Sequence, residues 1–353
     1  MTIDLSTGTL KAFPSAPPEP REPVFRRLTR RPETGALAGT VLVFVFFAII
    51  GGQNFVSVGG TSAWLNIASE LLIIAIPVGL LMIAGELDLS VGSVLAASSM
   101  TLAIVSGTLG LPMIIGVVAA LGIGALAGFV NGIITARTNV PSFVVTLGMN
   151  FALVGVTLGL SRTITGTTSV PLDVDPFFKA IFGSLIGGQF EVAIFWAIGV
   201  ALVIAWLLQM TPWGNWVFAI GGDKESARAT GIPVARVKIS LFVMSGLGAA
   251  FVGVIQTSLY NGAQTTSGQS FVFNSIIAVV IGGVLLTGGY GSVFGMVLGT
   301  LTFAIVNQGI YYTGWSSDWA SFILGALLLA AVLMNNTFRR LALASGPRKP
   351  RKK

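Results

Sequence analysis

The sequence predicts an all-α, polytopic membrane protein with about ten transmembrane helices. Of its 353 residues, 54% are hydrophobic and only 9% are charged, whereas an average soluble domain carries about 25% charged residues. The chain is divided into apolar runs near the length of about 20 residues that a membrane-spanning helix needs. Its basic residues are also distributed unevenly between the segments that separate these runs, as multi-pass proteins require.

Ten apolar segments are candidates for membrane-spanning helices, and short polar breaks separate them. The predicted spans are 36–52, 67–85, 90–107, 113–136, 142–161, 191–210, 237–259, 272–288, 293–312 and 319–335. With the N-terminus in the cytoplasm, all 20 Lys and Arg residues except Arg162 and Lys179 fall on the cytoplasmic side. The positive-inside rule therefore predicts that both termini are cytoplasmic.

This topology defines three regions: a flexible cytoplasmic tail 1–35, a transmembrane domain 36–338 and a basic cytoplasmic tail 339–353. Residues 162–190 form the predicted external loop, and residues 211–236 form the predicted cytoplasmic loop. The formal net charge of +7 is explained by this topology, so we do not expect nucleic acid binding. The basic C-terminal tail is expected to contact anionic membrane lipid.

Catalysis by this chain is not expected. It contains no His and no Cys, which excludes Ser-His-Asp and Cys-His nucleophilic sites as well as imidazole and thiolate metal ligands. The sequence has no GxxxxGK[ST] motif for binding ATP and no cluster of carboxylates for a metal ion. We therefore expect no catalytic residue, metal or cofactor in this chain.

Each of the two loops contains a short predicted element. In the external loop, the apolar stretch 177–185 is too short to span a membrane, which leaves a surface helix, a re-entrant segment or a plain connector. In the cytoplasmic loop, Asp223 and Gly231 are suited to begin and end a two-turn helix, Asp223–Thr230. So short a helix is unstable alone, and it needs a surface of this chain or of another protein.

A short internal similarity indicates a repeat. Residues 130–133 (VNGI), near the end of the fourth span, resemble residues 306–310 (VNQGI), near the end of the ninth. Because five is an odd number of spans, two five-helix halves would be inverted relative to each other, as in many transporters.

Three acidic residues lie at membrane depth, where a charge is costly. Glu70 lies near the outer start of the second span, where it either reaches the interface or has a function. Glu86 and Asp88 lie between the second and third spans, and Asp88 is placed to cap a helix that begins at Leu89. The two acids indicate either a tight cytoplasmic hairpin with solvated carboxylates or a broken helix whose backbone lines a passage.

Other polar side chains in or near the spans are candidates for a translocation path. Asparagines there either link helices through hydrogen bonds or line a route for a hydroxylated solute, and both interpretations are open. The candidate path residues are Asp88, Ser90, Asn131, Asn150, Asn274 and Asn307.

Several ordered motifs resemble those of ribose-type (simple sugar) ABC transporter permeases, which are subunits of the bacterial inner membrane. Residues 85–93, GELDLSVGS, resemble the family's GGIDLSVGS signature. Residues 219–232, AIGGDKESARATGI, resemble its AIGGNxxAARLSGI loop, and residues 279–283 and 288–295 follow its VVIGG and GGRGSVLG motifs. The resemblance covers about residues 36–335.

This resemblance implies the membrane-spanning subunit of an ATP-driven importer that moves a sugar or related hydroxylated solute by alternating access. The implied partners are an ABC ATPase subunit that carries ATP and Mg, an external sugar-binding protein, and a second permease subunit that is expected to be an identical copy. The helix in the cytoplasmic loop is then the coupling helix that docks on the ATPase. Its expected contact residues are Gly222, Asp223, Lys224, Glu225, Ala227, Arg228 and Gly231.

The chain departs from the family pattern in three places. Glu86 stands in place of the usual second Gly, Asp223 in place of Asn, and Val272–Asn274 in place of Glu-Leu-Asp. The alternative function is a self-sufficient secondary transporter that couples ions through Glu86 or Asp88. If the implied coupling role holds, Ala227→Glu should uncouple transport without disturbing the fold; if Asp88 is a cap, Asp88→Ala should impair assembly more than solute choice.

Overall fold

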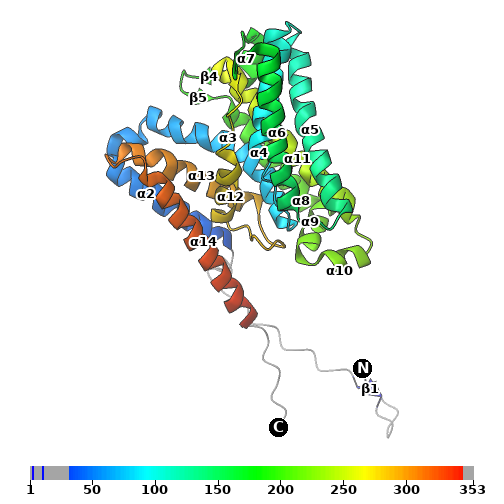
Figure 1. Ribbon diagram of the computed structural model, residues 1–353. Coiled ribbons are helices and arrows are strands. Elements are labelled where there is room, and N and C mark those ends of the chain that lie inside the picture. The colour runs from blue at the N-terminus through cyan, green and yellow to red at the C-terminus, as the bar shows by residue number, and fades with distance from the viewer. Residues whose placement is uncertain (1, 4–9, 12–31, 345–353) are drawn as a thin grey trace.

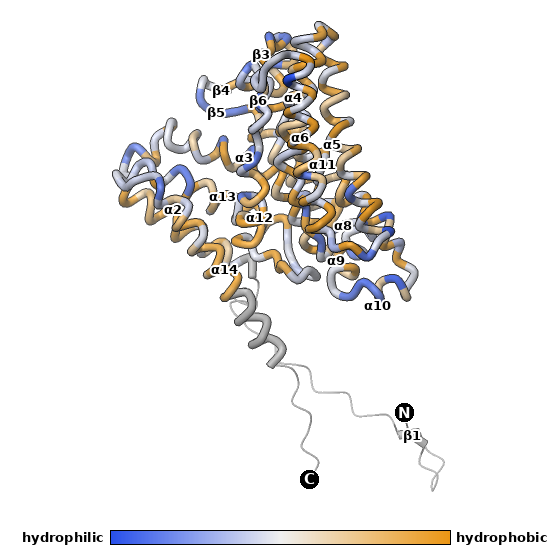
Figure 2. The backbone as a smooth tube through the Cα atoms, in the orientation of Figure 1, coloured by the Kyte–Doolittle hydropathy of each residue, from blue (hydrophilic) through white to orange (hydrophobic). Residues whose placement is uncertain are grey.

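The computed structural model describes residues 2–3, 10–11 and 32–344, with side chains described from residue 34 to residue 333. Long apolar helices run between two more polar ends (Figures 1 and 2). One end carries the helix α7 and the hairpin β4–β5, and we call it the α7 end. The other carries α9 and α10, and we call it the α10 end. The predicted tails 1–35 and 339–353 fall largely outside the described residues.

The elements follow one another as a chain of helices with three very short strand pairs. In order they are β1 (Thr2–Ile3), β2 (Leu10–Lys11), α2 (Pro32–Val56), α3 (Val58–Ile83), α4 (Val91–Leu102), the π-helical segment η1 (Ala103–Thr108), α5 (Met113–Arg137), α6 (Ser142–Thr165), β3 (Ser169–Pro171), α7 (Pro176–Phe182), β4 (Leu185–Ile186), β5 (Phe190–Glu191), α8 (Ala193–Met210), α9 (Pro212–Gly222), α10 (Lys224–Ala229), α11 (Val234–Tyr260), β6 (Gly262–Gln264), α12 (Phe271–Ile281), α13 (Val293–Gly309), η2 (Ile310–Tyr312) and α14 (Trp319–Ala344). The strand pairs are β1–β2, β3–β6 and β4–β5, all antiparallel.

The all-α, multi-pass prediction is confirmed. Within the described residues, eight helices are long and apolar enough to cross a membrane. Two shorter apolar helices, Phe271–Ile281 and Trp319–Leu333, occupy the eighth and tenth predicted spans. The backbone of α14 continues to Ala344, beyond the boundary predicted for the basic tail.

The prediction of a full eighth span at 272–288 is wrong. α12 has 11 residues, which rise about 16 Å, or roughly half the apolar thickness of a bilayer. Its end coincides with Gly282 and Gly283, and Gly283 has a φ of +89°, a conformation that favours glycine. The residues before α12 are not helical; they pack so closely on α4 that a Cβ atom on Gly92 would lie 2.6 Å from the carbonyl oxygen of Gly268.

The helix contacts fit the predicted pair of inverted halves. Each half contains a long helix (α3 or α11), a non-helical segment, a shorter helix (α4 or α12), and two further helices (α5 and α6, or α13 and α14). α3 packs against α13 while α11 packs against α5, and α4 packs against α6 while α12 packs against α14. The first helices break this correspondence, because α2 packs on α13 but α8 packs on α3.

At the centre, α3 and α11 are antiparallel neighbours. Near the α7 end, Gln256 Nε2 donates to Glu70 Oε2 at 2.7 Å, and near the α10 end Lys238 bonds to Glu86. Glu70 is therefore buried between helices, and the expectation that it reaches the membrane interface is wrong.

Most of the apolar stretch at 177–185 lies in the short helix α7 on the end of the bundle, and its last residue begins β4. Lys179 Nζ donates to the carbonyl oxygens of Ser258 at 2.6 Å and Leu259 at 3.0 Å, which belong to the last turn of α11. A positive charge is favourable there because these carbonyls have no partner inside the helix. The alternative of a surface helix therefore describes this stretch.

The hairpin β4–β5 is anchored on α3 by Asn66. Its Nδ2 donates to the carbonyl oxygen of Gln189 at 2.9 Å, and its Oδ1 accepts from the N–H of Glu191 at 3.0 Å. The Glu191 carboxyl is partly buried, and this burial raises its pKa from 4.5 to about 7. Glu70 lies near enough for the two carboxylates to repel each other.

The raised pKa of Glu191 predicts that the stability of the α7 end depends on pH. Because the folded-state pKa is raised above the unfolded value, stability is present below the unfolded pKa and is lost as the pH rises through about 7. Glu191→Gln should unfold at nearly the same temperature as the unchanged protein at pH 5, and at a higher temperature at pH 8, in detergent. The exposed Asp173→Asn is the control; an equal pH response in both variants would contradict the assignment.

Candidate functional site

A short non-helical segment, residues 84–90, separates α3 from α4 inside the bundle, and we call it the break. Gly85 has a φ of +79°, which turns the chain away from the α3 axis. The N–H of Leu87 donates to Ser142 Oγ at 3.0 Å, and the N–H of Leu89 donates to Thr146 Oγ1 at 3.1 Å. Hydroxyl groups of α6 therefore satisfy backbone donors that the interrupted helix leaves without partners.

The Asp88 carboxylate orders the last residues of the break, next to the start of α4, and joins them to α11. Only 1% of the residue is exposed. Its Oδ1 accepts from the N–H of Ser90 at 2.9 Å and from the Ser90 hydroxyl at 2.6 Å, and its Oδ2 accepts from the Ser245 hydroxyl at 2.7 Å. Asn131 Nδ2 on α5 donates to Ser90 Oγ at 2.9 Å. Burying a carboxylate is costly unless hydrogen-bond donors surround it, and these donors compensate the cost for Asp88.

Two expectations about this segment are wrong. α4 begins at Val91 and its N-cap Ser90 makes no side-chain capping bond, so Asp88 does not cap a helix beginning at Leu89. The hairpin with solvated acids is also wrong, because Glu86 is only 8% exposed and Asp88 less. The geometry is that of the other alternative, a broken helix. That the backbone of this helix lines a passage stays a prediction.

Glu86 forms a buried ion pair with Lys238 in the second turn of α11. Lys238 is 4% exposed, although the sequence identified it only as one of the cytoplasmic basic residues. Each charge compensates the other, and removing one would leave the other buried and unpaired. The pair therefore joins the first residues of the break to α11.

The candidate path residues do not all meet. Asp88, Ser90 and Asn131 belong to one hydrogen-bonded cluster at the break. Outside this cluster lie Asn150 on α6, Asn274 on α12 and Asn307 on α13.

Four residues that bond to the break were not among the predicted site residues: Ser142, Thr146, Ser245 and Lys238. Ser142 and Thr146 are four residues apart, so they share one face of α6. This spacing, and the position of Lys238 inside a predicted span, were the available sequence signals. Neither signal identifies which backbone groups or charges lie opposite.

Three buried polar atoms on α5 and α6 have no hydrogen-bond partner in the described part of the chain. They are Asn131 Oδ1, Thr135 Oγ1 and Asn150 Oδ1. Unpaired buried polar atoms are uncommon and need an explanation. Their oxygen atoms can accept hydrogen bonds from hydroxyl groups.

The predicted two-turn helix in the cytoplasmic loop is present as α10. Asp223 Oδ1 accepts from the N–H groups of Glu225 at 3.0 Å and Ser226 at 3.1 Å, while Oδ2 accepts from the Ser226 hydroxyl at 2.9 Å. These donors stabilise the ionised carboxylate, the Ser226 N–H most strongly, and lower the pKa of Asp223. Gly231 follows the helix with a φ of +87°, as predicted for its C-terminal end.

The loop also contains α9, which the sequence interpretation missed. The end of α9 packs on the end of α3: a Cβ atom on Gly221 would lie only 1.7 Å from the carbonyl oxygen of Ile83. That same carbonyl accepts from the N–H of Gly289 at 2.8 Å. The chain leading into α10 is thereby fixed beside the break.

Most of the expected coupling residues face away from the bundle. Gly222, Asp223, Glu225, Arg228 and Gly231 are exposed, and Lys224 is partly exposed. Figure 2 shows α10 as a hydrophilic stretch at the edge of the molecule. Ala227 is the exception, because it is 4% exposed and packs in the core of this chain. The side chain of Ala227 is therefore not available to a partner.

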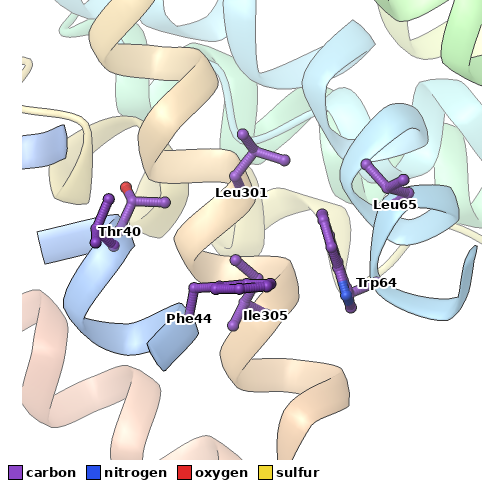
Figure 3. Close-up of a pocket in the computed structure, with 7 residues that line it drawn as sticks. Thr40, Phe44, Trp64, Leu65, Leu301 and Ile305 are labelled. Carbon is purple, nitrogen blue, oxygen red and sulfur yellow. The ribbon is translucent and has the colours of Figure 1, made fainter. Parts of the chain in front are cut away.

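A pocket of about 290 Å³ lies elsewhere, between α2, α3 and α13 (Figure 3). Aromatic and aliphatic side chains line it, including Phe44, Trp64 and Ile305. Its one hydroxyl, Thr40 Oγ1, already bonds to the carbonyl oxygen of Ala36 at 2.8 Å. This lining suits an apolar group and not a hydroxylated solute.

Asp88→Ala should impair assembly, because it removes the acceptor of three buried hydrogen bonds. Each buried donor left without a partner costs about 1–3 kcal/mol. We expect a lower yield of monodisperse protein and a lower Tm in detergent, with a smaller loss for Asp88→Asn, which keeps one acceptor oxygen. Normal yield combined with altered solute choice would contradict this role.

Ala227→Glu should prevent correct folding of the α9–α10 region, because it places a carboxylate in the apolar core. This replaces the expectation that the substitution leaves the fold intact. Ala229→Glu on the exposed side of α10 is the matched control. We expect aggregation or low yield for the first variant only, measured by size-exclusion chromatography; equal profiles would show that Ala227 tolerates a charge.

The chain is similar to several transport proteins along most of its length. A family model described as branched-chain amino acid transport system / permease component matches residues 60–332. The fructose import permease protein of Rhizobium meliloti is 30% identical over 309 residues, which cover 86% of this chain and 84% of the relative. The ribose import permease protein of Escherichia coli (strain K12) is 31% identical over 299 residues, covering 84% and 92%.

The galactose/methyl galactoside import permease protein of Salmonella typhimurium (strain LT2) is 30% identical over 318 residues, covering 86% of this chain and 94% of the relative. No solved structure matches the chain. The family model includes both the break and α10, the two features that the geometry singles out. The chain therefore belongs to the branched-chain amino acid transport system / permease component family of multi-pass membrane proteins.

Proposed function

We propose that the chain is the membrane-spanning subunit of an ATP-driven importer for a sugar or a related hydroxylated solute in the bacterial inner membrane. Family membership carries this proposal: the family is a permease component of a transport system. Three relatives that align along most of their length are named as import permeases for fructose, ribose and galactose/methyl galactoside. ATP and Mg would be held by a separate ABC ATPase subunit, and this chain would not itself be an enzyme.

α10 is the proposed coupling helix. A helix of six residues is not stable alone, and here Ala227 anchors it to its own chain while Glu225 and Arg228 stay exposed and Lys224 partly so. A groove of the ATPase would therefore meet Gly222, Asp223, Lys224, Glu225, Arg228 and Gly231. The bound carboxylate of Asp223 keeps the first turn of the helix formed before docking.

The proposed path for solute follows the polar groups of α5 and α6 beside the break. Asn131 Oδ1, Thr135 Oγ1 and Asn150 Oδ1 are unpaired acceptors, and hydroxylated solutes supply donors for them. Because these atoms are buried, alternating access would require the helices around the break to move. Asn274 and Asn307 stay candidates for the same path on the second half of the chain.

The alternative of a self-sufficient, ion-coupled transporter has less support. It depends on Glu86 or Asp88 as a group that takes up and releases an ion. Glu86 is paired with Lys238, and Asp88 already accepts three hydrogen bonds. Both carboxylates are thus engaged in holding the break.

Three further partners belong to the proposal. A second, identical permease subunit would complete the passage, an external sugar-binding protein would dock on the α7 end, and membrane lipid would contact the exposed apolar faces and the basic tail. The many large hydrophobic side chains exposed on α2, α5, α6 and α8 support contact with lipid or with a second subunit.

The decisive experiment is crosslinking from a single cysteine at Ala229→Cys in membranes. The chain has no native cysteine, and Ala229 is exposed. Ser226 is less suitable because its hydroxyl bonds to the capping Asp223. We expect a crosslink from this cysteine to an ABC ATPase, identified by mass spectrometry.

Asn139→Cys is the matched control, because it is exposed in the α5–α6 connection at the same end of the molecule. It should react with a soluble maleimide but capture much less ATPase. If both cysteines react from the cytoplasm and neither captures an ATPase, the proposed function is contradicted and the ion-coupled transporter becomes the leading hypothesis.

A further inference from the structure

The Glu86–Lys238 pair has no part in the hydrogen bonds that satisfy the break, yet it is buried inside an apolar bundle. A buried ion pair contributes little net stability compared with apolar side chains of the same size. Another ion pair, Glu225–Arg228 on α10, has both side chains exposed to solvent, at 74% and 58% of their area. The Glu86–Lys238 pair is buried where the break meets α11, and net stability alone does not explain why charges are placed there.

One side of the pair is connected to α10 through a short, hydrogen-bonded link. The N–H of Thr230 donates to the carbonyl oxygen of Ser226 at 3.1 Å, and the N–H of Ile232 donates to that of Ala227 at 3.2 Å. The N–H of Val237 then donates to the carbonyl oxygen of Pro233 at 3.1 Å. A displacement of α10 would therefore carry the first turns of α11, and Lys238 with them.

The other side of the pair belongs to the break. The N–H of Glu86 donates to the carbonyl oxygen of Leu81 at 2.9 Å, and the next N–H group is bound by α6. Asp88, two residues further on, holds the start of α4. A pull on the Glu86 carboxylate would thus act directly on the segment that separates α3 from α4.

α10 itself also lies within the electric field of the pair. The positive charge of Lys238 is the main cause that lowers the pKa of Lys224, and the negative charge of Glu86 acts against it. Lys224 stands in the first turn of α10. The pair therefore joins the break, through Glu86, to the helix that follows α10, through Lys238, and it lies close to the first turn of α10.

We propose that the Glu86–Lys238 ion pair is the link that transmits displacement of α10 to the break. If the charges separated, each would be left buried without a partner, so the break must follow α11 when α11 moves. Glu86 and Lys238 are positioning residues in this scheme, since neither needs to touch solute. The inference rests on the proposed function, because it takes the ATPase as the source of the displacement.

The test measures whether the break responds to the ATPase. Leu89→Cys places a single cysteine in the break at a partly exposed position. Its rate of reaction with a maleimide is measured in the permease–ATPase complex, without nucleotide and after trapping with Mg-ATP and vanadate. With the pair intact, we expect the two rates to differ by about fivefold or more, the lower end of typical coupling between sites.

In the Glu86→Gln/Lys238→Met background, the pair is replaced by neutral side chains of similar shape. ATP hydrolysis and vanadate trapping should persist, while the difference in labelling rate should be lost. Lys238→Arg keeps the charge and should keep the difference. The matched control is Glu70→Gln, which alters a buried polar link between the same two helices at the α7 end and should leave the difference intact.

The inference is overturned if the neutral variant keeps the full difference in labelling rate. It is also overturned if Glu70→Gln loses the difference to the same extent, or if the protein with the intact pair shows no difference. If the neutral variant fails to assemble, the swapped variant Glu86→Lys/Lys238→Glu is tested instead. A swapped variant that assembles should keep the difference in labelling rate. If it assembles and shows no difference, the inference is overturned. Failure to capture or trap any ATPase with the unmodified chain would instead contradict the proposed function.

Discussion

The structure depends on how the polar backbone of residues 84–90 is accommodated in an apolar bundle. An interrupted helix leaves N–H and C=O groups that cannot find water inside a membrane protein. Ser142 and Thr146 accept from two of these N–H groups, and Asp88 with Ser245 orders the start of α4. α4, α6 and α11 must therefore surround the break, and this requirement determines much of the packing on that side of the molecule.

Close backbone contacts at glycine make this packing geometrically feasible. On α5 and α11, a Cβ atom at Gly124 would lie 2.4 Å from the carbonyl oxygen of Gly246, and one at Gly128 would lie 2.2 Å from that of Phe242. The hydrophobic effect is weak between helices in lipid, so the helices are held by close van der Waals packing, which small residues at their contacts allow. The close approach of α5 to α11 brings Asn131 to the break, and in the other half α13 packs correspondingly on α3.

At the α10 end, one short helix is both anchored to the core and exposed to solvent. Ala227 anchors α10 to the core while its neighbours remain exposed. Gly221 packs on the last carbonyl of α3, so the chain that leads into α10 touches the helix that leads into the break. An exposed, charged surface is thus connected to the interior by short, well-packed contacts, which is consistent with the proposed role of α10.

Composition, apolar run lengths and the placement of basic residues determined the all-α, multi-pass fold from the sequence alone, because a bilayer constrains length and charge so strongly. Local rules also identified α10, since its cap and its terminating glycine lie within a few residues of each other. The partners of Glu86 and Asp88, the shortness of α12 and the inward side of Ala227 were decided only by the tertiary structure. Each depends on which distant group lies opposite, and Lys238 is 152 residues away from Glu86, a separation at which no local rule acts.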